Sequence, residues 1–389
     1  RKAEDKPSCG RLLSVCSSPS PFRTEIRLFK IRSRVQKRTT MGLTRYINAF
    51  YFPSWRIYRG QSPSTTDLDH TTHVFYAFLR IRDDGSVFHL DAKADLEYPA
   101  DGVKGCLHAF NTLKRQRYPN LQLLVSVGGG SGSQPFKEVA SRVDRRVRLA
   151  QALRDFVDRF ELNGVDLDWE HPSSPAEGRD YVLLLEELRR HLPAPQYVLT
   201  TALPVGEWCL KHIDVAKATE HVDFLNLMCY DFAGPWTELS GHQSQLYAPA
   251  SPHNAFSKRS GHGAVQYLRA RGVPSRKIVL GVPVYGRSFL GVDGVGQRFT
   301  GHAGDGGTFE YRDLPPADAQ EFFDEDLGTA GSVGPESGLV SYDTPDTVRL
   351  KAQYVRAHDL GGLFYWTGVA DVSGPRSLIQ AGYQVLSGV

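Results

Sequence analysis

Three carboxylates occupy every second position of one short apolar segment. Asp166, Asp168 and Glu170 alternate there with Val, Leu and Trp in the run NGVDLDWE. On a β-strand, residues two positions apart point to the same side, so the acids share one face and the apolar side chains the other. Burying three carboxylates is unfavourable unless they share protons or bind a cation. The spacing therefore predicts proton-transfer chemistry or a cation site, with a satisfied ion-pair network as the non-functional alternative.

The rest of the sequence gives little support to a metal or a cofactor. Hard divalent cations prefer oxygen ligands, but no His cluster and no further Asp-rich loop accompanies these acids. The five cysteines lack CxxC spacing, which argues against a zinc site or a disulfide scaffold. The glycines at 128–130 do not belong to a GxxxxGK[ST] phosphate loop. We expect no metal and no cofactor.

The elements that must position the acids alternate along the chain. Eight short apolar runs, several of them continuous as in strands buried on both faces, are separated by stretches with helical periodicity. This alternation predicts an α/β fold, a (β/α)8 TIM barrel, with the acids inside it and climbing toward the carboxyl-end rim where barrel enzymes keep their active sites. The predicted strands are 45–52, 72–79, 121–127, 164–168, 197–203, 223–229, 277–284 and 362–366, and the predicted helices include 143–160, 179–192 and 345–358.

Length and composition limit the remaining interpretation. The chain has 389 residues, of which 41% are hydrophobic and 23% charged, as in a protein with a packed core. A plain barrel needs about 250 residues, so we expect a catalytic barrel over 41–389 with a small α+β insertion at 288–340, between strands seven and eight. The net charge of +3 and the lack of an 18-residue apolar run argue against a nucleic-acid-binding polycation and a transmembrane helix. We expect a monomer without nucleic-acid or membrane partners.

Residues 1–40 differ in composition from the rest of the chain. They hold eleven Lys and Arg residues against three Asp and Glu residues. A disordered leader, or translated sequence upstream of Met41, explains this bias, while a mitochondrial transit peptide and a basic nucleic-acid tail are the alternatives. The longest apolar stretch is too short for a secretory signal. We therefore expect a cytoplasmic protein, with secretion as the alternative if the N-terminus is incomplete.

The acidic run and four further motifs together resemble family 18 of the glycoside hydrolases, the chitinases. NGVDLDWE is similar to the DxxDxDxE signature of that family. The resemblance includes SVGG at 126–129, MCYD at 228–231, YGR at 285–287 and Trp366, each near the end of a predicted strand and in the family's order. The insertion before the last strand is similar to that of the bacterial-type, or fungal class V, branch.

The resemblance implies a chitinase that hydrolyses β-1,4-linked N-acetylglucosamine polymers with retention, using the acetamido group of the substrate as the nucleophile. Glu170 would be the general acid and base, with a pKa raised by the neighbouring carboxylates. Asp168 would orient the acetamido N–H and share a proton with Asp166. Tyr230 would donate to the acetamido carbonyl, and Asp231 would hold sugar hydroxyls.

Contacts with the sugar chain, chitin or its oligosaccharides, are implied for a larger set of side chains. Tyr51 and Ser126 would hydrogen-bond Asp166, Trp366 would form an apolar floor, and Trp236 would stack a sugar on the leaving-group side. An ordinary structural role, such as core packing for Met228, is the alternative for each member. The candidate substrate-binding residues are Tyr51, Phe78, Ser126, Met228, Trp236, Tyr285, Arg287 and Trp366, and further aromatics that could extend the groove are Phe52, Trp55, Tyr58 and Tyr76.

Three positions depart from the family pattern without removing the acid. Asn163 stands where an Asp is usual, Gly130 where many members have Trp, and Thr367 where an acid is common. We expect a structural role for Asn163 and weaker leaving-side binding because of Gly130. Two other functions are the alternatives: a non-catalytic chitin-binding lectin, disfavoured because all three acids are present, and an enzyme for the chitobiose core of N-glycans, disfavoured by the insertion and the YGR motif.

Overall fold

The computed structural model of the chain describes residues 46–251 and 257–388. These residues belong to one unit, Tyr46–Val389. The expected basic leader at 1–40 and the first residues of the expected catalytic domain lie outside the described part. Within the described residues, no helix is both long enough and apolar enough to cross a membrane.

Eight parallel strands close into a barrel. Their spatial order is β1-β16-β10-β9-β8-β7-β6-β2, and β1 also pairs with β2, which completes the ring. The predicted (β/α)8 TIM barrel is therefore confirmed, and each predicted strand lies within a few residues of an observed one. The barrel strands are β1 (Ile47–Pro53), β2 (His73–Ile81), β6 (Gln122–Gly128), β7 (Gly164–Asp168), β8 (Val198–Pro204), β9 (Phe224–Met228), β10 (Ile278–Pro283) and β16 (Gly362–Trp366).

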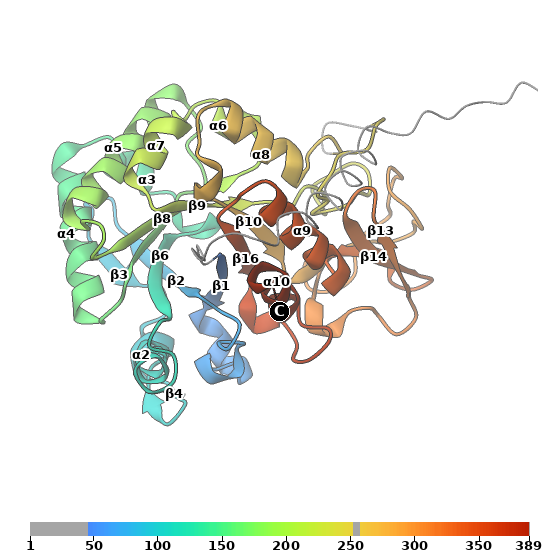
Figure 1. Cartoon of the computed structure of the whole chain (residues 1–389), viewed down its shortest axis with the longest axis horizontal. Helices are drawn as coiled ribbons and strands as arrows, with labels where there is room; N and C mark the ends of the chain where they lie inside the picture. The colour runs from blue at the N-terminus through green and yellow to red at the C-terminus, as the bar shows by residue number, and fades with distance from the viewer. Residues whose placement is uncertain (1–45, 252–256, 389) are drawn as a thin grey trace, which may run out of the picture. The chain divides into compact units, whose positions relative to one another are not determined.

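Helices surround the strands, and in Figure 1 α4, α5 and α7 lie on the outside of the barrel. Their starts follow ordinary capping chemistry: Ser174 accepts from the N–H of Glu177 ahead of α5, and Thr344 forms a capping box ahead of α9. The α-helices are α2 (Cys106–Gln116), α3 (Phe136–Ala140), α4 (Val143–Arg159), α5 (Pro175–His191), α6 (Glu207–Leu210), α7 (Val215–His221), α8 (Gly261–Ala270), α9 (Pro345–Ala357) and α10 (Leu378–Ser387).

The first β/α unit departs from the predicted alternation. β1 and β2 are joined by two 3-10 helices, η1 (Ser54–Arg59) and η2 (Pro63–Thr65), with no α-helix between them. Gly60, in a left-handed conformation at φ 77°, ends η1, and a proline opens η2. Gly and Pro so close together prevent a long helix, which explains the difference.

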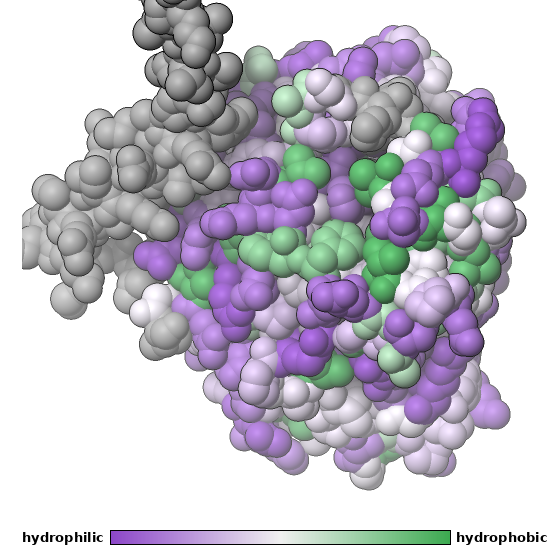
Figure 2. All heavy atoms as spheres, turned by 90° about the vertical axis from the view of Figure 1, so that its right-hand side faces the viewer, coloured by the Kyte–Doolittle hydropathy of each residue, from purple (hydrophilic) through white to green (hydrophobic). Residues whose placement is uncertain are grey.

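The long connection between β10 and α9 forms a separate antiparallel sheet. Its spatial order is β12-β11-β15-β14-β13, and its only helical element between Val284 and Thr344, all described, is the 3-10 helix η6 (Tyr311–Asp313). The helical part of the expected α+β insertion is therefore a single turn. Figure 2 shows the face that carries this sheet, where hydrophilic residues predominate and hydrophobic ones form smaller patches. The strands are β11 (Tyr285–Phe289), β12 (Thr308–Glu310), β13 (Gln320–Asp324), β14 (Thr329–Gly334) and β15 (Gly338–Tyr342).

Alternation along β7 separates two layers of side chains. Val165 and Leu167 belong to the main apolar core between strands and helices, together with Leu184 and Leu188 of α5. Asp166, between them in sequence, instead reaches partners on other barrel strands. A smaller apolar cluster fills the barrel interior around it and contains Tyr51, Phe75, Leu124, Phe224 and Phe364. The predicted inward direction is confirmed for Asp166.

Candidate active site

Asp166 lies inside the barrel, and both of its carboxylate oxygens accept hydrogen bonds. Oδ2 accepts from the hydroxyls of Tyr51 and Ser126, both at 2.8 Å. Oδ1 accepts from Thr200 Oγ1 at 2.7 Å and from Asn226 Nδ2 at 3.4 Å. The register of β6, β7 and β8 places Ser126, Asp166 and Thr200 side by side. Burial raises the pKa of Asp166, and these four donors oppose the rise because they stabilise the charged form.

Asp168, two residues further along β7, has few such partners. Its side chain is 4% exposed, and its Oδ1 is buried without a hydrogen-bond partner among the described residues. Burial, then the charge of Glu170, then that of Asp166 raise its pKa well above the ordinary value, while the Arg80 cation lowers it. A buried carboxylate that lacks donors resists ionisation, so Asp168 is suited to sharing a proton, and the stronger influence comes from Glu170.

Glu170 follows the end of β7 and is the most accessible of the three acids, with 27% of its side chain exposed. Its backbone N–H donates to Ser133 Oγ at 2.8 Å. Burial and the charge of Asp231 raise its pKa, opposed by the backbone N–H of Gly130. A general acid needs a raised pKa and must be reachable by the substrate, and both the direction of the pKa shift and the exposure of Glu170 fit that role.

His171 stands beside the acid as an uncharged neighbour. Its Nε2 lies 3.5 Å from Glu170 Oε2, and its Nδ1 is buried without a hydrogen-bond partner in the described structure. Burial lowers its pKa to about 4. The ring packs edge-on against Trp208, which is 47% exposed, with the ring centroids 5.2 Å apart. Because His171 is neutral above that pKa, it does not supply a positive charge that would favour ionised Glu170.

A second group of polar side chains gathers around Asp231, just past the end of β9. Asp231 Oδ1 accepts from the Tyr285 hydroxyl at 2.8 Å and from Arg287 Nε at 2.9 Å, and Arg287 Nη2 lies 2.8 Å from the same oxygen. Arg287 also lies under the ring of Trp236, with Cζ 4.8 Å from the ring centroid. Tyr230 is half-buried, and burial together with the Tyr285, Asp168 and Glu170 charges raises its pKa well above the ordinary value. Its hydroxyl therefore remains a donor.

Tyr285 and Arg287 come from a different element than expected. The barrel strand β10 ends at Pro283, and both residues belong to β11, the first strand of the insertion. The insertion sheet accordingly begins at residue 285, a few residues before the predicted 288. Only Val284 separates the two strands, and it continues the apolar run, so hydrophobicity alone does not mark the boundary.

Aromatic rings form a row at the mouth of the barrel. Phe78 lies between Trp366 and Trp55, at centroid distances of 5.8 Å and 6.3 Å, with interplanar angles of 28° and 26°. Tyr51 meets Trp366 edge-on at 5.5 Å. Trp366 is half-buried and Trp55 is 38% exposed. These rings offer apolar faces of the kind that pack against the C–H faces of sugars.

Two aromatics proposed for the groove point the other way. Phe52 and Tyr76 are 0% and 1% exposed and pack against Phe110 of α2 at 4.8 Å and 6.2 Å. They occupy the outward positions of β1 and β2, so the prediction that they line the groove is wrong. Tyr58 is exposed and hydrogen-bonds Asp91 at 3.0 Å. Met228 is half-buried and packs against the apolar cluster of the barrel interior.

The described residues contain no cluster of three or more His, Cys, Asp or Glu side chains arranged to hold a metal ion. The cysteines among them, Cys106, Cys209 and Cys229, are buried and free. Asn163 has the structural contacts expected of it, since its Oδ1 accepts from the N–H of Leu123 at 2.9 Å.

Several residues around the acids are not identified from motifs. Thr200 and Asn226 bond Asp166 from β8 and β9, Ser133 bonds the backbone of Glu170, and Arg80 acts on Asp168 from β2. Strand alternation alone indicates that every second residue of β8 and β9 faces inward. That rule could have found Thr200 and Asn226, whereas Ser133 and Arg80 reach the site through loop geometry.

Comparison with known proteins gives a consistent picture. Residues 47–371 match the family described as Glycosyl hydrolases family 18. The chain is similar to Endochitinase 1 of Metarhizium robertsii, at 34% identity over 366 residues that cover 88% of this chain and 86% of the relative. Among solved structures it is similar to chitinase ChiA74 from Bacillus thuringiensis (TM-score 0.81, 25% identity, 88% of this chain and 70% of that one). It is also similar to the Ostrinia furnacalis Group IV chitinase in complex with allosamidin (TM-score 0.80, 25% identity, 88% and 99%). Since the family match spans most of its length, the chain belongs to glycosyl hydrolase family 18.

Proposed function

We propose that this protein is a chitinase that cleaves β-1,4-linked N-acetylglucosamine chains with retention of anomeric configuration. The observation that carries the proposal is the difference between the three acids of β7: Asp166 is saturated with donors, Asp168 lacks them, and Glu170 is accessible with a raised pKa. With these differences, Glu170 at the barrel rim is the acid that would transfer a proton to the substrate. Family membership and the chitinases among its relatives support the same activity.

The first chemical step uses Glu170 as the acid. Its carboxyl proton goes to the glycosidic oxygen as the bond to the anomeric carbon breaks. The acetamido oxygen of the same sugar attacks that carbon, which gives a cyclic oxazolinium ion. Water then opens the ring with Glu170 accepting its proton, so the product keeps the starting configuration.

Asp168 and Tyr230 act on the acetamido group. The Asp168 carboxylate accepts the acetamido N–H and offsets the positive charge that develops on the ring, which also satisfies its unpaired oxygen. Tyr230, whose raised pKa keeps its proton, donates to the acetamido carbonyl. Asp231, held by Tyr285 and Arg287, accepts from sugar hydroxyls through its remaining capacity.

The rim supplies the binding surface for a chain of sugars. Trp366 packs against Tyr51, which hydrogen-bonds Asp166, and would form the floor beneath the reacting ring. Trp236, which is 52% exposed and stacks with Arg287, would contact a further sugar. All described site residues come from one chain, so we propose that the protein works as a monomer.

A time course on chitin oligomers tests the proposal. We expect shorter oligomers whose fresh products carry the β-configuration, observed by NMR within the first minutes, and no cleavage of matched oligomers that lack the 2-acetamido group. Products of the opposite configuration, or equal cleavage without the acetamido group, would contradict substrate assistance. Binding without turnover would indicate a lectin, and cleavage of a high-mannose glycoprotein but not of chitin would indicate an N-glycan enzyme.

A further inference from the structure

A buried arginine lies behind the acids and takes no part in the chemistry described so far. Arg80 of β2 is 8% exposed. Its Nη1 donates to the carbonyl of Gly128, and its Nη2 donates to Ser131 Oγ at 2.8 Å. Both bonds end on the glycine loop, residues 128–132, which includes the 3-10 helix η4 (Gly130–Gly132). Arg80 therefore ties β2 to this loop.

The glycine loop lies directly against the backbone that carries two of the acids. The N–H of Gly129 donates to the carbonyl of Asp168 at 2.8 Å. Ser133, next to the loop, donates its hydroxyl to the Gly129 carbonyl at 3.0 Å and accepts the N–H of Glu170 at 2.8 Å. A shift of the loop would therefore move the backbone of both Asp168 and Glu170.

The fit between Arg80 and the loop depends on a missing side chain. A Cβ at Gly132 would lie only 1.5 Å from Arg80 Nη1, so any other residue at 132 would displace the guanidinium. Gly128, at φ 110°, has a comparable restriction, since a Cβ there would lie 2.2 Å from the carbonyl oxygen of Asp168. Glycines at these positions let the arginine and the acid backbone approach the loop closely.

Arg80 also contributes charge. The pKa of Asp168 is raised by burial, Glu170 and Asp166, and Arg80 opposes this rise. In return, burial lowers the pKa of Arg80 while Asp168 raises it. The titratable groups that act on Asp168 or respond to its charge are Asp166 and Glu170 near β7, Arg80 on β2, Tyr51 on β1, Tyr181 on α5 and Tyr230 after β9.

We propose that Arg80 is a positioning residue for hydrolysis, which holds Asp168 and Glu170 in place through the glycine loop. The inference rests on the proposed function, in which these two acids act on the substrate. Arg80 does not need to touch the substrate, and its burial keeps it behind the loop.

The test compares Arg80→Gln with Arg146→Gln. Arg146 on α4 is a matched control because it is also 8% exposed and donates Nη1 to a backbone carbonyl, that of Ala140, at 2.6 Å. In Arg80→Gln, Asp168 should take up its proton at higher pH, so the acidic limb of the kcat/KM profile should move up by about half a unit or more. We expect kcat to fall by about tenfold or more with KM nearly unchanged, because the loop positions reacting groups without holding the sugar. Arg146→Gln should leave both profiles unchanged.

Two further variants separate charge from packing. Arg80→Lys should restore the position of the acidic limb but only part of kcat, and Gly132→Ala should move the limb in the same direction as Arg80→Gln while the arginine is still present. If Arg80→Gln does not fold, Gly132→Ala carries the test. A folded Arg80→Gln or Gly132→Ala protein with a wild-type profile, or an equal shift in Arg146→Gln, would overturn the inference. Wild-type protein inactive on chitin oligomers would instead contradict the proposed function.

Discussion

Two of the regions that bury carboxylates treat the charge in opposite ways. Beside α9, Asp343 and Lys351 are each 1% exposed and pair at 2.6 Å. Asp343 also accepts from Thr347 Oγ1 at 2.6 Å and Ser244 Oγ at 2.7 Å. In the barrel, Asp168 is nearly as buried, yet its Oδ1 has no hydrogen-bond partner among the described residues, and the charges of Glu170 and Asp166 raise its pKa.

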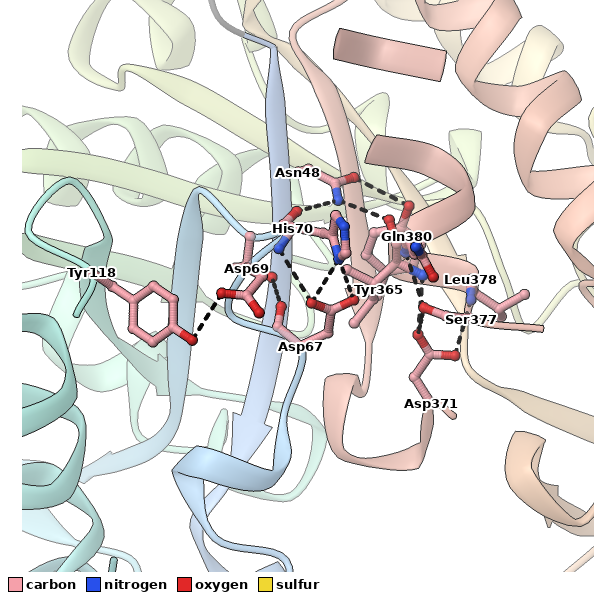
Figure 3. A network of polar contacts seen from close by, with 12 residues as sticks. Asn48, Asp67, Asp69, His70, Tyr118, Tyr365, Asp371, Ser377, Leu378 and Gln380 are labelled. Atoms are coloured by element: carbon pink, nitrogen blue, oxygen red, sulfur yellow. Dashed lines mark hydrogen bonds and ion pairs between the residues drawn. The ribbon is translucent and has the colours of Figure 1, made fainter. Parts of the chain in front are cut away.

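A further carboxylate, that of the half-buried Asp371, is also supplied with donors. Figure 3 shows Asp371 ahead of α10, where its oxygens accept from Ser377 Oγ at 2.8 Å and from the N–H groups of Leu378 and Ile379 at 3.0 Å and 3.1 Å. Exposed N–H groups at a helix start are natural partners for a carboxylate. A carboxylate with enough hydrogen-bond donors therefore stabilises the fold, whereas a buried carboxylate without them is available for proton transfer.

The largest expected effect comes from removing the proton that the site delivers. Glu170→Gln keeps the size of the side chain but cannot protonate the leaving oxygen, so kcat on chitin oligomers should fall by about 10⁴-fold. Oligomer affinity, measured by calorimetry, should change little. Glu187→Gln on α5, a buried acid paired with Arg190, is the control and should keep full activity. Near-wild-type turnover in Glu170→Gln would contradict the assignment of Glu170 as the general acid.

Breaking the Asp343–Lys351 pair should lower the free energy of unfolding and leave kcat unchanged. Lys351→Met leaves Asp343 buried without its cation, and breaking a buried pair in this way costs about 3–5 kcal/mol. We expect that loss in the free energy of unfolding measured with urea, with kcat unchanged for the folded fraction. The double variant Lys351→Met with Asp343→Leu should recover most of the stability, because no unpaired charge remains. A loss of kcat in folded Lys351→Met would show that the two regions are coupled.

Asp168→Asn should have the opposite effect, with a lower kcat and a higher free energy of unfolding. The amide cannot supply the negative charge that offsets the developing ring cation, so kcat should fall by about 10²–10³-fold. The pKa of Asp168 is raised in the folded protein by burial and by Glu170. Wild-type stability is therefore lost as pH rises from the unfolded-state pKa through the higher folded-state pKa, and the uncharged variant escapes this loss.

Urea unfolding at several pH values measures that difference. Asp168→Asn and wild type should have similar free energies of unfolding in acid, where both are uncharged at this position, and the variant should become the more stable of the two as pH rises. A variant less stable than wild type at neutral pH would mean that Asp168 is compensated like Asp343.

The barrel and the shared face of the three acids can be predicted from the sequence because both depend on the spacing of apolar and polar residues. A period of two in NGVDLDWE sets which side chains share a face, and the apolar runs mark strands. The same rule fails for Phe52 and Tyr76, because a strand buried on both faces is apolar at every position and does not reveal which residues point inward. Only the register with neighbouring strands decides this, and register depends on residues far apart in the chain.

Arg80 illustrates what a motif-based interpretation misses. In THVFYAFLRI, a basic residue after an apolar run looks like the end of a strand reaching solvent. Its partner is the carbonyl of Gly128, 48 residues away, and its space exists because Gly132 has no side chain. Such a fit is set by the path of the loop, which local residue types do not specify.

The smallest expected effect comes from making Asp166 more like Asp168. Thr200→Val removes the 2.7 Å donor to Oδ1 and leaves that oxygen with Asn226 at 3.4 Å. A lost hydrogen bond to a buried charged group costs about 1–3 kcal/mol, and because that bond stabilised the ionised form, the pKa of Asp166 should rise further. The loss of stability should therefore shrink as pH is lowered and Asp166 takes up a proton. Thr201→Val is the matched control, since Thr201 is also buried but donates to the neutral carbonyl of Leu167 at 2.7 Å, so its loss should not vary with pH in this range. Equal pH dependence in both variants would mean that the charge on Asp166 does not depend on its donors, and the contrast between satisfied and unsatisfied carboxylates would then lose its physical basis.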